Sequence, residues 1–269
     1  AAFLTTAFVV GGIGAWYLLT KRRSDHGRVM VGMAVSIIVW LAPLQLLLGD
    51  MHGLNVRDHQ PAKLAAMEGH WETQRGAPLI LIAWPDMAEE ANHFELAIPR
   101  IGSLILTHSW DGEITGLKAF APQDRPYAPI VFWSFRLMVG VGMLMILVAA
   151  LSAWLFLRKR LFDSRWFLRL LVLCSPLGFV AVIAGWVTAE VGRQPWVVYG
   201  LLRTTDAVSP VPGGSVAASL TLFVLVYGVI FGAGLYYIAK VIRQGSAGSL
   251  PEPEPMAPRR PMAAADYGD

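Results

Sequence analysis

The chain has 269 residues, of which 55% are hydrophobic and only 15% are charged. Soluble domains average about 45–50% apolar and about 25% charged residues, so this composition argues against a soluble enzyme and against a disordered chain. The net charge of +3, without a basic stripe interleaved with aromatic residues, argues against nucleic acid as a partner, and the single Cys174 excludes a disulfide framework.

Five apolar stretches are long enough to cross a bilayer, which takes about 20 residues. We therefore expect an all-α fold, a polytopic membrane helix bundle with five transmembrane helices. Because each stretch is apolar on all faces, length and hydrophobicity carry this prediction rather than a helical moment. The expected spans cover residues 1–20, 29–49, about 129–157, 170–189 and about 215–239, so that residues 1–49 hold two transmembrane helices and residues 128–243 hold three.

Basic residues in the short loops predict the orientation of the spans. They follow the first, third and fifth spans, which places them on one side of the membrane, and we expect that side to be cytoplasmic. Residues 50–127 carry 6 basic and 11 acidic residues and are expected on the other side. The basic residues concerned are Lys21, Arg22, Arg23 and Arg28, then Arg158, Lys159, Arg160 and Arg165, then Lys240 and Arg243.

The segment of residues 50–127 is too long for a turn, and we expect it to be partly ordered. Residues 61–71 read as a short helix with Pro61 near its start, and prolines interrupt the rest of the segment, among them Pro78, Pro85, Pro99 and Pro122. Residues 244–269 include alternating proline and glutamate, a composition that cannot sustain a helix. We expect them to form a disordered cytoplasmic tail.

Two ionisable residues fall inside the expected spans, where a charge is expensive and usually functional. Arg136 lies about two turns into the third span, and Glu190 closes the fourth, both towards the outer side. They could bind a cofactor between them, or line a polar path in a transporter or channel subunit. Alternatively, they could pair with each other or extend their charged ends outward.

Met138 and Glu190 offer atoms that can ligate iron. A thioether is a soft donor that suits haem iron, although most methionines of membrane helices only pack. Trp186 lies one turn before Glu190 and could pack on a macrocycle or serve as an interfacial anchor. No histidine falls in an expected span, so an imidazole ligand would have to come from outside this sequence.

Lys63 and Glu68 lie in the predicted short helix beside an apolar stripe. A cation and a carboxylate near the membrane could hold a quinol, with a donor for a ring oxygen and an acceptor for its proton. The alternative is a solvated amphipathic helix lying on the bilayer.

Three motifs occur in order and are separated by spans: Pro-Ala-Lys-Leu-Ala-Ala-Met-Glu at residues 61–68, Phe-Trp-Ser-Phe-Arg-Leu-Met at 132–138, and Gly-Arg-Gln-Pro-Trp at 192–196. Together they resemble subunit I of cytochrome bd-type quinol oxidase, from residue 1 to about residue 240. Members of that family have nine spans. We therefore expect this chain to be the C-terminal part of the subunit, with the N-terminal helices and the histidine ligands absent.

The resemblance assigns a role to each residue that matches a family motif. Lys63 and Glu68 match the quinol-binding pair of the extracytoplasmic Q-loop. Met138 matches an axial ligand of the low-spin haem b, and Arg136 the arginine beside it. Glu190 matches the ligand of the high-spin haem b. Trp186 matches a tryptophan that helps electron transfer, and Arg193 a support for a haem propionate.

The resemblance also implies an activity, cofactors and partners. It implies an electrogenic ubiquinol or menaquinol oxidase that passes electrons through haems b to haem d, or a haem b in its place, and reduces oxygen to water without pumping protons. It implies a bacterial inner membrane complex with oxidase subunit II, a small accessory subunit and membrane lipid. This piece alone is expected to be inactive. A haem-binding relative that does not oxidise quinol is a further alternative.

Overall fold

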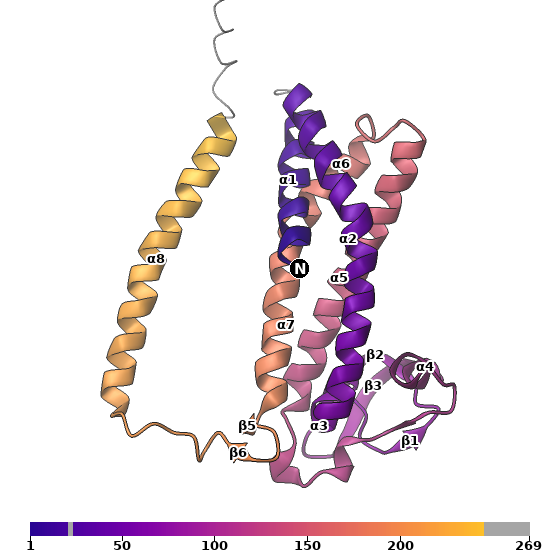
Figure 1. Ribbon diagram of the computed structural model, residues 1–269, viewed down its shortest axis with the longest axis vertical. Coiled ribbons are helices and arrows are strands. Elements are labelled where there is room, and N and C mark those ends of the chain that lie inside the picture. The colour runs from indigo at the N-terminus through magenta and orange to yellow at the C-terminus, as the bar shows by residue number, and fades with distance from the viewer. Residues whose placement is uncertain (21–23, 245–269) are drawn as a thin grey trace, which may run out of the picture. The chain divides into compact units, whose positions relative to one another are not determined.

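The computed structural model describes residues 1–20 and 24–244 (Figure 1). Five helical segments in this part of the chain are long and apolar enough to cross a membrane, as predicted: Ala2–Leu19, Asp25–His59, Pro122–Leu157, Arg165–Arg193 and Gly213–Gln244. The basic residues Lys21, Arg22 and Arg23 lie outside the described residues, as does the predicted tail after Gln244.

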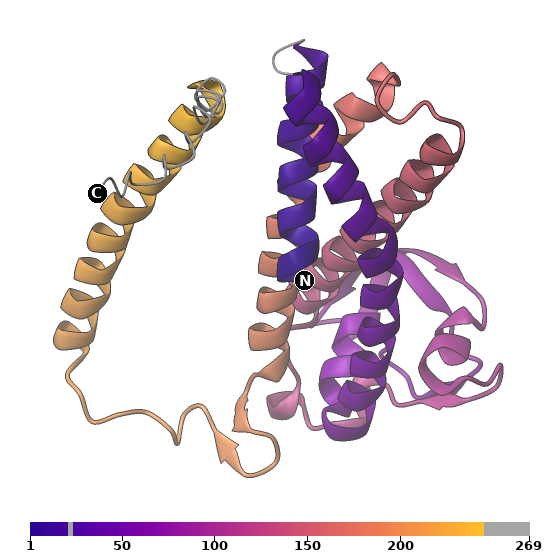
Figure 2. The same ribbon diagram turned by 45° about the horizontal axis from the view of Figure 1, so that its top comes forward.

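The first compact unit, Ala1–Val208, contains four of the five membrane-length segments, made of five helices that lie side by side (Figure 2) and share an apolar core. They are α1 (Ala2–Leu19), α2 (Ser24–His59), α5 (Ala128–Leu157), α6 (Arg165–Cys174) and α7 (Leu177–Arg193). The core includes Phe8, Ile38, Val148 and Phe167, all fully buried. α2 continues ten residues beyond the predicted end of its span, because no proline follows Pro43 until Pro61.

The fourth span is two helices rather than one. α6 ends at Cys174 and α7 begins at Leu177, with Pro176 between them. Proline has no backbone N–H, and its ring clashes with the preceding turn, so it interrupts a helix. The span also begins at Arg165, five residues before the predicted start.

α1 packs very closely across this break. A Cβ added at Gly12 would lie 2.5 Å from Cβ of Ser175, which immediately follows α6. A Cβ added at Gly178 in α7 would lie 2.6 Å from Oγ1 of Thr5. Small residues let membrane helices approach at backbone distance, where van der Waals packing holds them together.

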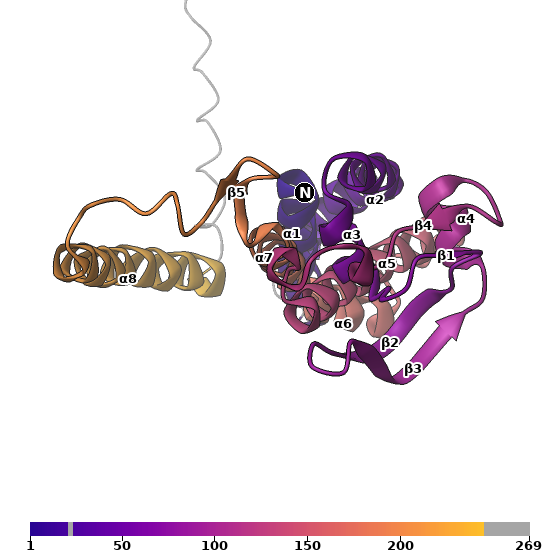
Figure 3. The same ribbon diagram turned by 90° about the horizontal axis from the view of Figure 1, so that it is seen from below.

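The segment between α2 and α5 gathers at one end of the bundle (Figure 3). It contains two antiparallel strand pairs, β1 with β4 and β2 with β3, which the sequence analysis did not anticipate. α3 is shorter than the predicted helix, because Gly69 adopts a left-handed φ of 74° that ends it. The elements are α3 (Pro61–Glu68), β1 (Gln74–Arg75), β2 (Leu79–Asp86), β3 (Ala91–Ile98), α4 (Ile101–Thr107), β4 (Glu113–Ile114), and the short 3-10 helices η1 (Leu117–Ala119) and η2 (Pro122–Asp124).

A short hairpin follows α7, formed by β5 (Trp196–Val198) and β6 (Leu202–Arg203). The second compact unit begins at Ser209 and contains α8 (Gly213–Gln244), a helix of 32 residues. Its composition and length fit a membrane span.

Candidate functional site

α3 is the element that brings the predicted quinol residues to the bundle, since it contacts both α5 and α7. Lys63 and Glu68 are five residues apart, which separates them by about 140° around a helix. They therefore face different neighbours. Glu68 meets α5, whereas Lys63 meets α7.

Glu68 forms a buried ion pair with Arg136 of α5. Nη2 of Arg136 donates to Oε2 of Glu68 at 2.7 Å, and the side chains are only 11% and 7% exposed. Nε of Arg136 donates to the backbone oxygen of Ile80 in β2, also at 2.7 Å, and the guanidinium lies 4.8 Å from the centre of the Phe132 ring. Arg136 thus joins α5, α3 and β2. The alternative that Arg136 and Glu190 pair with each other is wrong.

Lys63 extends along α7. A Cβ added at Gly192 would lie 2.9 Å from Cγ of Lys63, so the aliphatic part of the side chain fills the space above this glycine. Within the described residues, its ammonium has no hydrogen bond or ion pair. Burial lowers the pKa of Lys63, as does the charge of Arg193, whereas the charge of Glu190 raises it.

Glu190 and Arg193 pair with each other one turn apart at the end of α7. Both side chains are nearly half exposed, at 46% and 42%, so this pair is weakly held compared with that of Arg136. Trp186 lies one turn before Glu190 and is 65% exposed. Its indole therefore presents an open aromatic surface one helical turn from Glu190.

Met138 contacts α7 at Gly185. A Cβ added at Gly185 would lie 2.7 Å from Sδ of Met138, so the thioether rests against bare backbone, next to Trp186 in sequence. A thioether such as that of Met138 is a known ligand of haem iron. A carboxylate such as the half-exposed one of Glu190 can also bind iron. The donor set of α5 and α7 therefore fits iron porphyrin chemistry.

Two buried polar atoms at the ends of α3 lack a partner. Among the described side chains, Oε1 of Gln60 and Nε2 of His70 are the only fully buried nitrogen or oxygen atoms without a hydrogen bond. Buried polar groups are nearly always bonded, so such atoms mark a place where a ligand can bind. Neither residue was predicted, although Gln60 directly precedes the motif of residues 61–68 and His70 follows it after Gly69.

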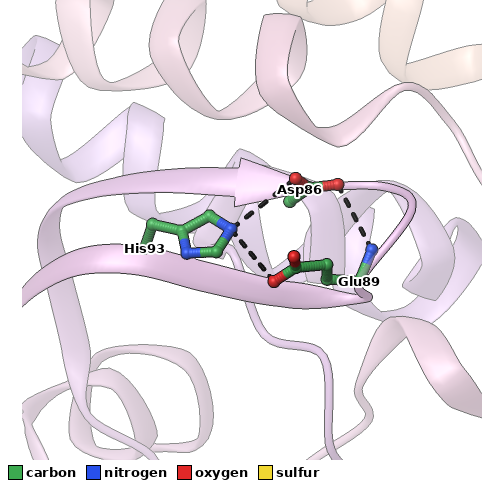
Figure 4. Close-up of side chains that lie close together, drawn as sticks. All are labelled: Asp86, Glu89 and His93. Atoms are coloured by element: carbon green, nitrogen blue, oxygen red, sulfur yellow. Dashed lines mark hydrogen bonds and ion pairs between the residues drawn. The ribbon is translucent and has the colours of Figure 1, made fainter.

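A separate polar cluster closes the turn of the β2–β3 hairpin (Figure 4). Oδ1 of Asp86 accepts the backbone N–H groups of Ala88 and Glu89, at 2.7 and 3.2 Å, and these bonds lower the pKa of Asp86. Nε2 of His93 lies 3.6 Å from Oδ2 of Asp86 and 3.3 Å from Oε2 of Glu89. The cluster joins the two strands at an exposed tip, and none of its members was predicted.

A sequence profile of the family described as cytochrome bd terminal oxidase subunit I matches residues 1–246. Cytochrome bd-II ubiquinol oxidase subunit 1 of Escherichia coli (strain K12) is 30% identical, over 91% of this chain and 60% of its own length. Cytochrome bd ubiquinol oxidase subunit 1 of Bacillus subtilis (strain 168) is 33% identical, over 91% of this chain and 55% of its own length.

A solved structure, the bd oxidase from Geobacillus thermodenitrificans, superposes with a TM-score of 0.80 at 32% identity. The match covers 90% of this chain and 55% of that one. The chain therefore spans a little over half the length of these relatives.

Proposed function

Since the chain belongs to the cytochrome bd terminal oxidase subunit I family, we propose that it forms the quinol-binding and haem-binding part of a terminal oxidase. The complete enzyme would oxidise quinol and reduce oxygen to water. The observation that carries this proposal is the position of α3, whose two charged residues reach different helices. Glu68 meets the helix of Met138, and Lys63 meets the helix of Glu190.

On the substrate side, we assign quinol binding to α3. The unpaired ammonium of Lys63 can donate a hydrogen bond to a ring oxygen of ubiquinol or menaquinol. Oε1 of Gln60 is an unpaired acceptor that a quinol hydroxyl can satisfy. The ion pair of Glu68 with Arg136 holds this end of α3 on α5, so the site is preorganised rather than assembled on binding.

On the haem side, Met138 would ligate the low-spin haem b and Glu190 the high-spin haem b. A haem d, or a third haem b, completes the set in the whole subunit. Haem supplies one-electron transfer and oxygen chemistry when bound. Arg136 places a fixed positive charge two residues before Met138, which favours a reduced acceptor. Trp186 offers its exposed indole to a porphyrin face, and Arg193 offers a cation to a propionate.

We further propose that the segment between α2 and α5 lies outside a bacterial inner membrane and that the basic loops lie in the cytoplasm. Protons from quinol would then be released outside, while protons for water are taken from the cytoplasm. This arrangement is electrogenic without a proton pump. The partners are oxidase subunit II and a small accessory subunit, within membrane lipid. A transport path lined by Arg136 and Glu190 finds no support, because each pairs with another residue.

The test is a reduced-minus-oxidised visible spectrum of the complete purified complex. Met138→Leu should remove or shift the low-spin haem b signal, and Glu190→Ala should lower the high-spin haem b content. Met143→Leu, in the same helix and 53% exposed, is the matched control and should leave the spectrum unchanged. Unaltered spectra in both site variants would contradict the haem assignment.

A further inference from the structure

His70 is a buried histidine with a free ring nitrogen beside the Glu68–Arg136 pair. It is 2% exposed, and its Nε2 has no hydrogen-bond partner. Its backbone is fixed on both sides, because its N–H donates to the oxygen of Ala65 and its oxygen accepts the N–H of Leu117. The imidazole is therefore held in place while one of its polar atoms remains unsatisfied.

Charges surround this imidazole. Burial lowers the pKa of His70 and is the largest influence on it; the carboxylate of Glu68 raises it, Arg136 lowers it, and Glu95 raises it least, so that the pKa lies below its usual value. The ring is thus neutral at pH 7 and carries one proton, leaving the other nitrogen as an acceptor. With the proton on Nδ1, the unpaired Nε2 is that acceptor.

Glu68 is poorly suited to accept the proton of a quinol. Its Oε2 already accepts from Arg136, whose side chain is only 11% exposed. Glu68 is the counter-charge of that buried guanidinium and holds α3 on α5. The ion pair suits a positioning role, and another group must take the proton.

Asn92 links the two residues that flank His70 to the carboxylate of Glu95. Nδ2 of Asn92 donates to the backbone oxygen of Gly69 at 2.9 Å and to Oε2 of Glu95 at 3.0 Å. Nε1 of Trp71 donates to Oδ1 of Asn92 at 2.9 Å. Asn92 therefore binds the residues on either side of His70 to β3 and holds the exposed carboxylate of Glu95 near the imidazole.

We propose that Nε2 of His70 accepts a proton from quinol bound at α3 and that Glu95 passes this proton to solvent. The inference rests on the proposed quinol site. A quinol O–H bond breaks and an Nε2–H bond forms, giving an imidazolium, which then returns its proton through Glu95 to water. The cycle runs twice for each quinol, while its two electrons leave singly to haem iron, the acceptor that the family implies.

The experiment uses the complete complex with a short-chain ubiquinol, measured from pH 5 to pH 8. A positioned acid–base group contributes about 10²–10⁴-fold, so His70→Gln should lower quinol turnover by at least about 10²-fold. It should also abolish the fall in rate on the acidic side of the profile. Haem spectra and turnover with an electron donor that bypasses quinol should be unchanged. His108→Gln, a histidine of the same segment with a 65% exposed side chain, is the control.

A second variant covers the case in which His70→Gln does not assemble. Glu95→Gln alters an exposed side chain and keeps an oxygen for Asn92, so it should fold, and it should slow quinol turnover several-fold without affecting the bypass donor. Glu113→Gln, exposed in β4, is its control. Turnover within twofold of wild type and an unchanged acid limb in His70→Gln would overturn the proposal. If His70→Gln fails to assemble, unchanged quinol turnover in Glu95→Gln would overturn the proposal instead.

A readout that does not depend on turnover is the infrared difference spectrum of the oxidised complex between pH 5 and pH 8. A neutral imidazole that becomes protonated contributes a ring band to this spectrum. The band of His70 should be absent from His70→Gln and present in His108→Gln. The site itself is tested by Lys63→Met. A raised quinol KM in Lys63→Met with a normal His70→Gln profile would refute only the proton acceptor. An unchanged KM would refute the quinol site.

Discussion

Lys63 reaches along α7 because residue 192 is a glycine. A Cβ at this position would lie 2.9 Å from Cγ and 3.3 Å from Cδ of Lys63, too close for both to keep their places. Gly192→Ala should therefore displace the ammonium and raise the quinol KM by about tenfold, the equivalent of about 1.4 kcal/mol for one lost hydrogen bond. Gly32→Ala in α2, where nothing lies within 4 Å of the added carbon, should leave the KM unchanged.

Gly185→Ala should act on a haem rather than on quinol. The new methyl group would lie 2.7 Å from Sδ of Met138, so the thioether must move. We expect an altered low-spin haem spectrum with a quinol KM close to that of wild type. The Gly192→Ala variant provides the opposite pattern, a changed KM with an unaltered spectrum. If both variants change both quantities equally, the two sites are not separate.

The ion pair of Glu68 and Arg136 should dominate the stability of this end of the bundle. Removing one partner of a buried pair typically destabilises a protein by about 3–5 kcal/mol, because the other charge remains buried. Glu68→Gln and Arg136→Gln should each lower the melting temperature of the complex. The melting temperature of the double variant should fall by clearly less than the sum of the two single shifts. Additive shifts would show that the residues do not depend on each other.

The hairpin turn should depend on pH through Asp86. Its pKa in the folded protein is lowered from 3.8, first by the backbone N–H groups of Ala88 and Glu89. A depressed carboxyl pKa adds stability above the unfolded value, and this is lost as pH falls through the folded value. Asp86→Ala should therefore speed hydrogen exchange of the hairpin at pH 7. After correction of the exchange rates for their intrinsic pH dependence, the difference in hairpin exchange between Asp86→Ala and wild type should shrink below about pH 4.

The membrane spans could be predicted because hydrophobicity and length are local properties of the sequence. The break at Pro176 was missed because the apolar stretch of residues 170–189 continues across it. The strands β2 and β3 were missed because their prolines and charged turn were interpreted as irregular loop. A pattern of apolar residues at 79–84 is compatible with a strand, but only pairing with β3 distinguishes it from a buried coil.

The sequence predicted most residues of the candidate site, but it did not predict which of them contact one another. Arg136 and Glu68 lie 68 positions apart, and neither propensity nor spacing indicates that they meet. The same holds for Lys63 and Gly192, which become neighbours only when α3 folds back onto α7. His70 could not be singled out from the sequence, since its burial depends on the turn at Gly69 and on the packing of β3.

The close packing of α1 has a mechanical consequence for α7. One straight helix touches the chain on both sides of the Pro176 interruption, at Gly12 against Ser175 and at Thr5 against Gly178. α1 therefore restrains bending at Pro176, so we expect the break between α6 and α7 to be rigid and not a hinge. A displacement of α7 would therefore displace α1 as well, so we expect Trp186 and Glu190 to keep a constant spacing from the rest of the bundle.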